Sequence, residues 1–159
     1  MQQSLTPPYL STGIVNQLGD HTFTSAEITK FAKYFDPQFF HVDPEAARDS
    51  LFGGHCASGW HTISMWMRKQ RDFAKSEAEN LQKNGHNPPE YGPSPGVRNI
   101  KWLKPVFAGD TISYFTEIAG LRPSGSRPGW HLLSQKCGGR NQNGQTVLEF
   151  DSTVFIRIS

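Results

Sequence analysis

The hydrophobic pattern of this chain changes its period once, near residue 96. Before this point apolar residues recur with helical spacing, and after it they alternate with the period of two that is typical of strands. An amphipathic helix and a half-buried sheet must each bury an apolar face, and in a chain of 159 residues they can do so against each other. The pattern therefore predicts one α+β domain over residues 1–159, with the sheet wrapped around a long helix.

Three helices are expected in the first part of the chain. After an extended lead-in over residues 14–23, Thr24 and Glu27 form a capping box that should start a helix, and Pro37 should stop it near Asp36. The pair Asp43-Pro44 should open a short second helix, which Gly53-Gly54 ends. A long third helix is predicted over residues 57–84, with its first half buried and its second half exposed.

Four strands are expected in the second part, after a loop that prolines interrupt. They are rich in β-branched and aromatic residues, and they cover residues 97–104, 111–121, 130–136 and 146–158. Asn143-Gly144 is a two-residue hairpin signal between the last two strands. Short links of this kind predict an antiparallel sheet.

Composition excludes several classes of protein. A net charge of +2 does not predict nucleic-acid binding, and no stretch approaches the roughly 20 apolar residues of a membrane span. The segment Met1 to Leu10 does not have the pattern of a secretory signal. Cys56 and Cys137 are isolated, which indicates neither a zinc site nor a disulfide framework. We therefore expect a cytoplasmic protein with reduced thiols and no membrane or nucleic-acid partner.

Asp36 and His41 are the first candidates for chemistry. Four residues separate them in a segment that Pro37 restrains, so both side chains could face one cavity. A carboxylate and an imidazole are the groups that proton transfer near neutral pH requires. The structural alternative is that Asp36 caps a turn and His41 hydrogen-bonds the backbone.

The start of the long helix is the second candidate. Gly53-Gly54 leads through Ser58 to Gly59, where the free N–H groups and the positive end of the helix dipole could receive a carbonyl oxygen. The alternative is that Gly53-Gly54 only turns the chain and that Gly59 lets the helix pack closely against the sheet. Spacing alone leaves both interpretations open.

The segment FAKYFDPQFFHVDPEAARDSLFGGHCASGWH resembles the hydratase motif of MaoC-like dehydratases and (R)-specific enoyl-CoA hydratases. In that motif Asp, four residues, His and then Asp-Pro precede a helix that begins near a Gly. RNIKWLKPVFAGDTI is similar to a strand-turn-strand of the same family. Together the two segments extend the resemblance over most of residues 20–158.

The resemblance implies a hot-dog fold that is a homodimer or a higher homo-oligomer, with an acyl tunnel near the subunit interface. It implies that Asp36 and His41 are the catalytic pair and that the Gly59 N–H is the oxyanion donor. The implied reaction is the hydration of an enoyl thioester or the reverse dehydration. The implied partner is an acyl-CoA substrate, with no separate cofactor because coenzyme A is part of that substrate.

Other residues are candidates for substrate contacts. Many family members have Asn-Pro between the catalytic Asp and His, where this chain has PQFF, so Gln38 could replace the orienting amide while Phe40 narrows the pocket. Arg127, in a basic hairpin tip, could grip the phosphates of coenzyme A or be an ordinary solvated residue. The remaining candidates lie around the start of the long helix: Gly54, Ser58 and Trp60.

Four further polar residues near the motif have simpler interpretations. We expect His55 and His61 to be solvent-facing or bonded to the backbone, and Cys56 to be a small packing residue. Asp43 is expected to cap the second helix. A metal site is not expected, because Asp36, His41 and Asp43 lack a recognised ligand spacing.

Two alternative functions remain open from the sequence. A hot-dog acyl-CoA thioesterase would use the same helix-end oxyanion site but direct water at the carbonyl carbon. A non-catalytic acyl-thioester-binding module would keep the scaffold without the reaction. Asp36 and His41 together favour the hydratase.

Overall fold

The computed structural model describes residues 6–159. Residues 1–5, which begin the segment Met1 to Leu10 discussed above, lie outside the described residues. A 3-10 helix, η1 (Pro8–Leu10), precedes strand β1 (Val15–Thr22). The extended lead-in is therefore a strand, and it pairs antiparallel with a strand from the far end of the chain, so that Thr22 lies opposite Thr111.

The first helix, α1 (Ser25–Phe35), confirms the predicted start and stop. The Thr24 side chain caps it by accepting a hydrogen bond of 3.2 Å from the Glu27 N–H, and Asp36 is the C-cap residue directly before Pro37. The predicted second helix is wrong in detail. The structure has a four-residue helix α2 (Phe39–Val42) before Asp43 and a 3-10 helix η2 (Ala46–Asp49) after it.

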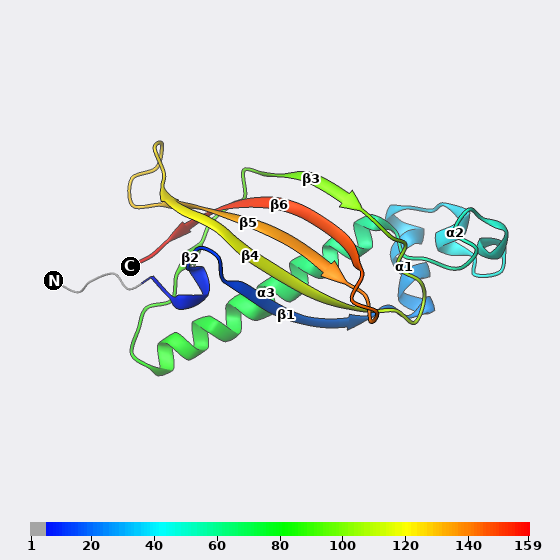
Figure 1. The fold of residues 1–159 in the computed structure, drawn as a ribbon, viewed down its shortest axis with the longest axis horizontal. Helices are drawn as coiled ribbons and strands as arrows, with labels where there is room; N and C mark the ends of the chain where they lie inside the picture. The colour runs from blue at the N-terminus through cyan, green and yellow to red at the C-terminus, as the bar shows by residue number, and fades with distance from the viewer. Residues whose placement is uncertain (1–5) are drawn as a thin grey trace.

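The long helix α3 (Gly59–Lys83) confirms the prediction for residues 57–84 and runs the length of the sheet (Figure 1). Its side chains packed beneath the sheet include Trp66, Gln70 and Ala74, which continue one face from Thr62 onward. No helix in residues 6–159 is long and apolar enough to cross a membrane.

The sheet is antiparallel and has six strands in the order β1-β4-β5-β6-β2, with β3 also paired to β6. All four predicted strands are present, and β1 and the short β2 add to them. β2 was not expected, because it lies in the proline-interrupted loop. The strands after α3 are β2 (Glu90–Tyr91), β3 (Gly96–Trp102), β4 (Thr111–Pro123), β5 (His131–Arg140) and β6 (Thr146–Arg157).

Two details of the β5–β6 hairpin differ from the sequence prediction. β5 does not end at Lys136 but continues through Gly138 and Gly139 to Arg140. The turn also contains three residues between the paired Asn141 and Gln145, rather than two. Gly144 takes the left-handed conformation there, with φ of 75°, and its N–H donates to the Asn141 carbonyl.

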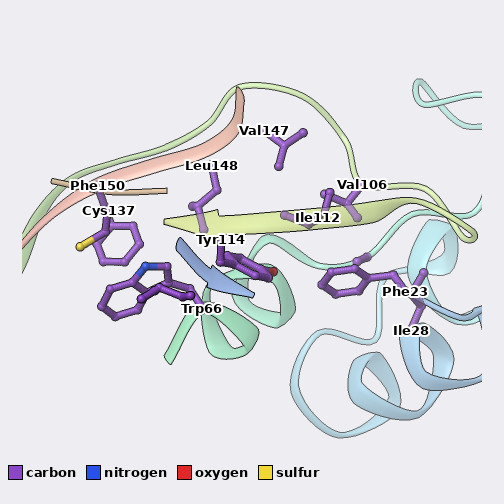
Figure 2. Packing of buried hydrophobic residues seen from close by; sticks show 12 residues of the cluster. Phe23, Ile28, Trp66, Val106, Ile112, Tyr114, Cys137, Val147, Leu148 and Phe150 are labelled. Carbon is purple, nitrogen blue, oxygen red and sulfur yellow. The ribbon is translucent and has the colours of Figure 1, made fainter. Parts of the chain in front are cut away.

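The core lies between α3 and the concave face of the sheet (Figure 2). The Trp66 indole meets the Phe150 ring edge-on at 4.8 Å, and the buried Tyr114 hydroxyl donates a hydrogen bond of 2.7 Å to the Thr62 carbonyl. A curled antiparallel sheet around one central helix confirms the expected α+β hot-dog fold. The helices α1 and α2 lie together at one end of the sheet, beside the start of α3 (Figure 1).

Candidate active site

A cavity of about 460 Å³ lies where α1 ends and α3 begins. Its walls come from four segments: the end of α1 through α2, the loop before α3, the first turn of α3 and the end of β3 with the residues after it. It is lined by Asp36, Gln38, Phe40, His41, Phe52, Cys56, Ala57, Ser58, Gly59, Trp60, Thr62, Trp102, Leu103, Lys104, Pro105 and Val106. Within this lining Asp36 is the only carboxylate and Lys104 the only lysine or arginine.

The Asp36 carboxylate is held by two hydrogen-bond donors. The Ser58 hydroxyl donates to Oδ2 at 2.6 Å, and the Gln38 amide donates to Oδ1 at 2.8 Å. Burial by itself would raise the pKa of Asp36, but these two hydrogen bonds and the nearby His41 outweigh it and lower the pKa below its ordinary value. Asp36 is therefore ionised at neutral pH and fixed in orientation.

His41 lies on α2, and its imidazole is oriented from both sides. Nδ1 is 2.7 Å from the Cys56 carbonyl oxygen, and because a carbonyl can only accept, Nδ1 carries the hydrogen. Nε2 is then the atom that faces Asp36 Oδ2, at 3.3 Å. A carboxylate and an imidazole at this distance are close enough for a proton to pass between them, which is the arrangement that acid/base chemistry requires.

His55 supports His41 from behind through the backbone. His55 Nε2 donates to the His41 carbonyl at 2.7 Å, and its Nδ1 lies 3.0 Å from the Ser25 hydroxyl on α1. His55 is only 8% exposed. The expectation of a backbone-bonded histidine is confirmed, and the contact joins α1 to α2 beside Asp36 and His41.

Gly59 is the first residue of α3, with Ser58 as its N-cap. Among residues 6–159 no acceptor is bonded to the Gly59 N–H, which lies at the positive end of the helix dipole and in the cavity lining. A Cβ at this position would lie 2.5 Å from two atoms of the Trp102 indole. The indole therefore lies against the backbone here, and a larger residue at position 59 would require the ring to move.

Trp102 was missed by the sequence analysis, although it belongs to the segment RNIKWLKPVFAGDTI. A β-bulge between Arg98 and Lys101 adds one residue to β3, with Asn99 in the left-handed region at φ of 54°. Past the bulge, Trp102 is paired with the inward-facing Leu148, so it points toward α3. A regular strand would have placed Lys101 there instead.

Four of the six substrate-contact candidates line the cavity, and two do not. Gln38, Phe40, Ser58 and Trp60 are in the lining. Gly54 lies outside it and packs against the Phe107 ring. Arg127 is in the turn between β4 and β5, where its guanidinium stacks over Phe155 at the end of the sheet opposite α1 and α2 (Figure 1). Within this chain Arg127 cannot reach Asp36 and His41.

The other polar residues follow their simpler interpretations in part. Cys56 is buried, and burial raises the pKa of its thiol to about 11, so it is no thiolate at neutral pH. Asp43 accepts hydrogen bonds from the Glu45 and Ala46 N–H groups, but it is the C-cap residue of α2, and the N-cap residue of η2 is Glu45. His61 is buried among aromatic rings rather than facing solvent. Within residues 6–159 no three His, Cys, Asp or Glu side chains are grouped as a metal site.

Removing the Ser58 hydroxyl should weaken the carboxylate that it holds. In Ser58→Ala, Asp36 loses its shortest hydrogen bond, so its pKa should rise and the acid limb of the pH–rate profile should move to higher pH. A lost hydrogen bond to a charged group corresponds to a fall in kcat/KM of roughly tenfold at neutral pH. Ser58→Thr, which keeps the hydroxyl, serves as the control. An acid limb that does not move in Ser58→Ala would contradict this role.

Comparisons with known proteins identify the family and agree with the fold. A model of the family described as MaoC like domain matches residues 14–127. A MaoC-like dehydratase from Rhodospirillum rubrum is 31% identical, with a TM-score of 0.76 over 94% of each chain. An (R)-hydratase from A. caviae involved in PHA biosynthesis shares the fold, at 19% identity and a TM-score of 0.66 over 96% of this chain and all of that one. The Bacillus subtilis (strain 168) protein YdeM, described as uncharacterized, is 25% identical over 135 residues, which are 82% of this chain and 84% of YdeM.

Proposed function

The chain belongs to the MaoC-like domain family, and from this premise we propose that it adds water to an enoyl thioester or removes it from a 3-hydroxyacyl thioester. One observation carries the proposal. Asp36 and His41, which we propose share one mobile proton, line the same cavity as the free Gly59 N–H. Such a reaction needs an acid/base group that transfers protons and a hydrogen-bond donor that stabilises a developing oxyanion.

In the hydration direction the thioester oxygen accepts a hydrogen bond from the Gly59 N–H. A water molecule binds at Asp36, whose carboxylate takes one of its protons while the oxygen attacks the β-carbon. The electron pair of the double bond moves toward the thioester, and the helix N-terminus stabilises the resulting enolate-like charge. The oxygen of water thereby becomes the hydroxyl of a 3-hydroxyacyl thioester.

His41 completes the reaction by protonating the α-carbon. Nε2 releases the shared proton to that carbon, which leaves a neutral imidazole and a protonated Asp36. Because Nε2 and Oδ2 lie 3.3 Å apart, the proton taken from water can pass from Asp36 to His41 and restore the starting state. Dehydration runs the same steps in reverse. No proton has to be exchanged with solvent.

We expect an acyl-CoA as substrate and a homodimer or higher homo-oligomer as the working form. Large apolar side chains near the cavity are open to solvent: Tyr34 is 77% exposed, Phe35 71% and Trp60 54%. Exposed apolar patches of this kind typically mark contacts with another protein chain. Such a contact would also cover the open side of the cavity, where Trp102 is 44% exposed.

A spectrophotometric assay at the enoyl-thioester absorbance tests the proposal, with crotonyl-CoA and a panel of longer, branched and dicarboxylic enoyl-CoAs. A hydratase removes the enoyl signal without releasing free thiol. Free thiol would instead indicate the alternative acyl-CoA thioesterase. Binding of acyl-CoA without turnover across the panel would indicate the non-catalytic binding module. Either of these results would overturn the proposed reaction.

A further inference from the structure

The helix that carries His41 is too short to hold its own position. α2 has four residues, and isolated helices shorter than about 12 residues are marginal in water. The residues from Asp36 to Gln38 connect it to the end of α1, so α2 needs a second attachment that fixes where it lies. The distance of 3.3 Å between Asp36 Oδ2 and His41 Nε2 depends on that attachment.

Residues 55 and 56 provide the second attachment. The His55 side chain donates to the His41 carbonyl at 2.7 Å, while the Cys56 carbonyl accepts from His41 Nδ1, also at 2.7 Å. The Cys56 N–H donates to the Phe40 carbonyl at 3.5 Å. Carbonyls at the end of a helix have no partner inside the helix, so these contacts satisfy them. The backbone and the side chain of His41 are thus both held by the same two residues.

His55 is itself held by two other parts of the fold. Its backbone carbonyl accepts a hydrogen bond of 3.0 Å from the Ala108 N–H, in the segment that leads to β4. Because its Nε2 carries the hydrogen donated to His41, its Nδ1 is an acceptor, and the Ser25 hydroxyl donates to it at 3.0 Å. Thr29 Oγ1 lies 3.5 Å from the same Nε2. Ser25 and Thr29 are both on α1, so the imidazole of His55 links α1 to α2.

The position of His55 lets it act on the site without contacting a substrate. It is 8% exposed, and it does not line the cavity that contains Asp36 and His41. Within residues 6–159 no backbone N–H is bonded to the His41 carbonyl, so His55 is the partner of that group. Removing the imidazole would leave a buried carbonyl unpaired, a state that proteins avoid, and would break the link between the two helices.

We infer that His55 is a positioning residue, which holds His41 at its distance from Asp36 by linking α1 to α2. The kinetic consequence rests on the proposed function, whereas the effect on the His41 ring does not. A misplacement of about 1 Å can lower the rate of a catalysed step roughly 10²-fold. Position 55 needs a donor toward His41 and an acceptor toward Ser25, and a glutamine amide also supplies both.

Steady-state kinetics of three variants test the positioning role. His55→Leu should lower kcat roughly 10- to 100-fold and change KM less than about twofold, because the residue moves His41 but touches no substrate. His55→Gln should restore most of kcat, since it replaces the donor and the acceptor. His61→Leu is the matched control, because His61 is also buried, at 6% exposure, but lies outside the cavity lining. It should leave kcat unchanged.

The ¹⁵N signals of the His41 imidazole test the inference without turnover, and their loss in His41→Asn assigns them. In the wild-type protein Nδ1 should have the shift of a nitrogen that carries a hydrogen, because it donates to the Cys56 carbonyl. In His55→Leu the ring should exchange between its two tautomers, so the Nδ1 shift should move toward their average. His55→Gln should return the shift to its wild-type value.

Several results would overturn the inference: an unchanged kcat in His55→Leu, an equal fall in His61→Leu, or a fall that His55→Gln does not reverse. If no enoyl-CoA is hydrated, the proposed function fails and the Nδ1 signal decides alone, since an unchanged shift in His55→Leu would exclude the positioning role. Ser25→Ala keeps the test decisive if His55→Leu does not fold. It removes the donor to His55 at an exposed position of α1, and an unchanged kcat and Nδ1 shift there would also overturn the inference.

Discussion

Asp36→Asn is expected to lower kcat/KM for enoyl-thioester hydration by roughly 10²- to 10⁴-fold, which is the usual effect of losing a positioned acid or base. An amide has the shape of the carboxylate but cannot take a proton from water. It also removes the carboxylate that would share a proton with His41, whose Nε2 lies 3.3 Å from Asp36 Oδ2. Steady-state kinetics on the best substrate of the enoyl-CoA panel measures the effect.

The fold should survive this substitution. The Asn side-chain oxygen can still accept a hydrogen bond from one of the two donors, Gln38 or Ser58, and the Ser58 hydroxyl can accept one from the new amide. Asp20→Asn is the matched control, because Asp20 is an exposed residue of β1 outside the cavity lining. Unchanged activity in Asp36→Asn, with the control also unchanged, would remove Asp36 from the mechanism.

The elements that sequence reasoning predicted are those with a local cause. Thr24 and Pro37 mark the ends of α1 because a cap and a proline act on their immediate neighbours. The 25-residue α3 was predicted because its apolar spacing persists over several turns. The strands β3, β4 and β6 were predicted for the same reason, with a period of two.

The elements that it missed depend on distant parts of the chain. Gly138 suggests the end of a strand, yet a Cβ there would lie 2.5 Å from the Leu148 carbonyl oxygen and 2.8 Å from the Phe115 ring. The glycine is thus required by close packing inside β5, which only the neighbouring strands reveal. β2 likewise exists only because β6 offers Glu90 and Tyr91 a partner.

The candidate site shows the same division. The resemblance to the hydratase motif indicated Asp36 and His41 as the pair, but only the fold brings Ser58, 22 residues away, within 2.6 Å of the carboxylate. The position of Trp102 depends on a bulge whose only local signal is Asn99, and a single Asn does not by itself indicate a bulge inside a strand. Arg127 was a candidate contact for coenzyme A because its charge suits phosphate. Its charge does not indicate at which end of the sheet the turn between β4 and β5 lies.

Buried His61 should make the protein lose stability as pH falls from about 6.5 to 4. Its ring stacks on Phe31 at 4.5 Å and meets Phe23 edge-on. Within residues 6–159 its buried Nδ1 has no hydrogen-bond partner. Burial lowers the pKa of His61 to about 4, although the carboxylate of Glu27 opposes the shift. Between these pH values the imidazole of His61 therefore binds a proton in the unfolded chain but not in the folded protein.

The contribution of His61 to the free energy of unfolding is fully present above pH 6.5. It decreases as the pH falls from 6.5 to 4, because the unfolded chain binds the proton first, and below pH 4 it no longer changes. A pKa lowered to about 4 corresponds to a loss of about 3 kcal/mol in the free energy of unfolding. Urea unfolding at a series of pH values measures it. His61→Phe keeps an aromatic ring and should flatten the dependence, whereas the exposed His86→Phe should not.

Glu27 and Asp36, whose pKa values are lowered, should lose their contributions to stability only at lower pH, in the wild-type protein and in the variants alike. An equally steep loss of stability between pH 6.5 and 4 in His61→Phe would show that another group is responsible.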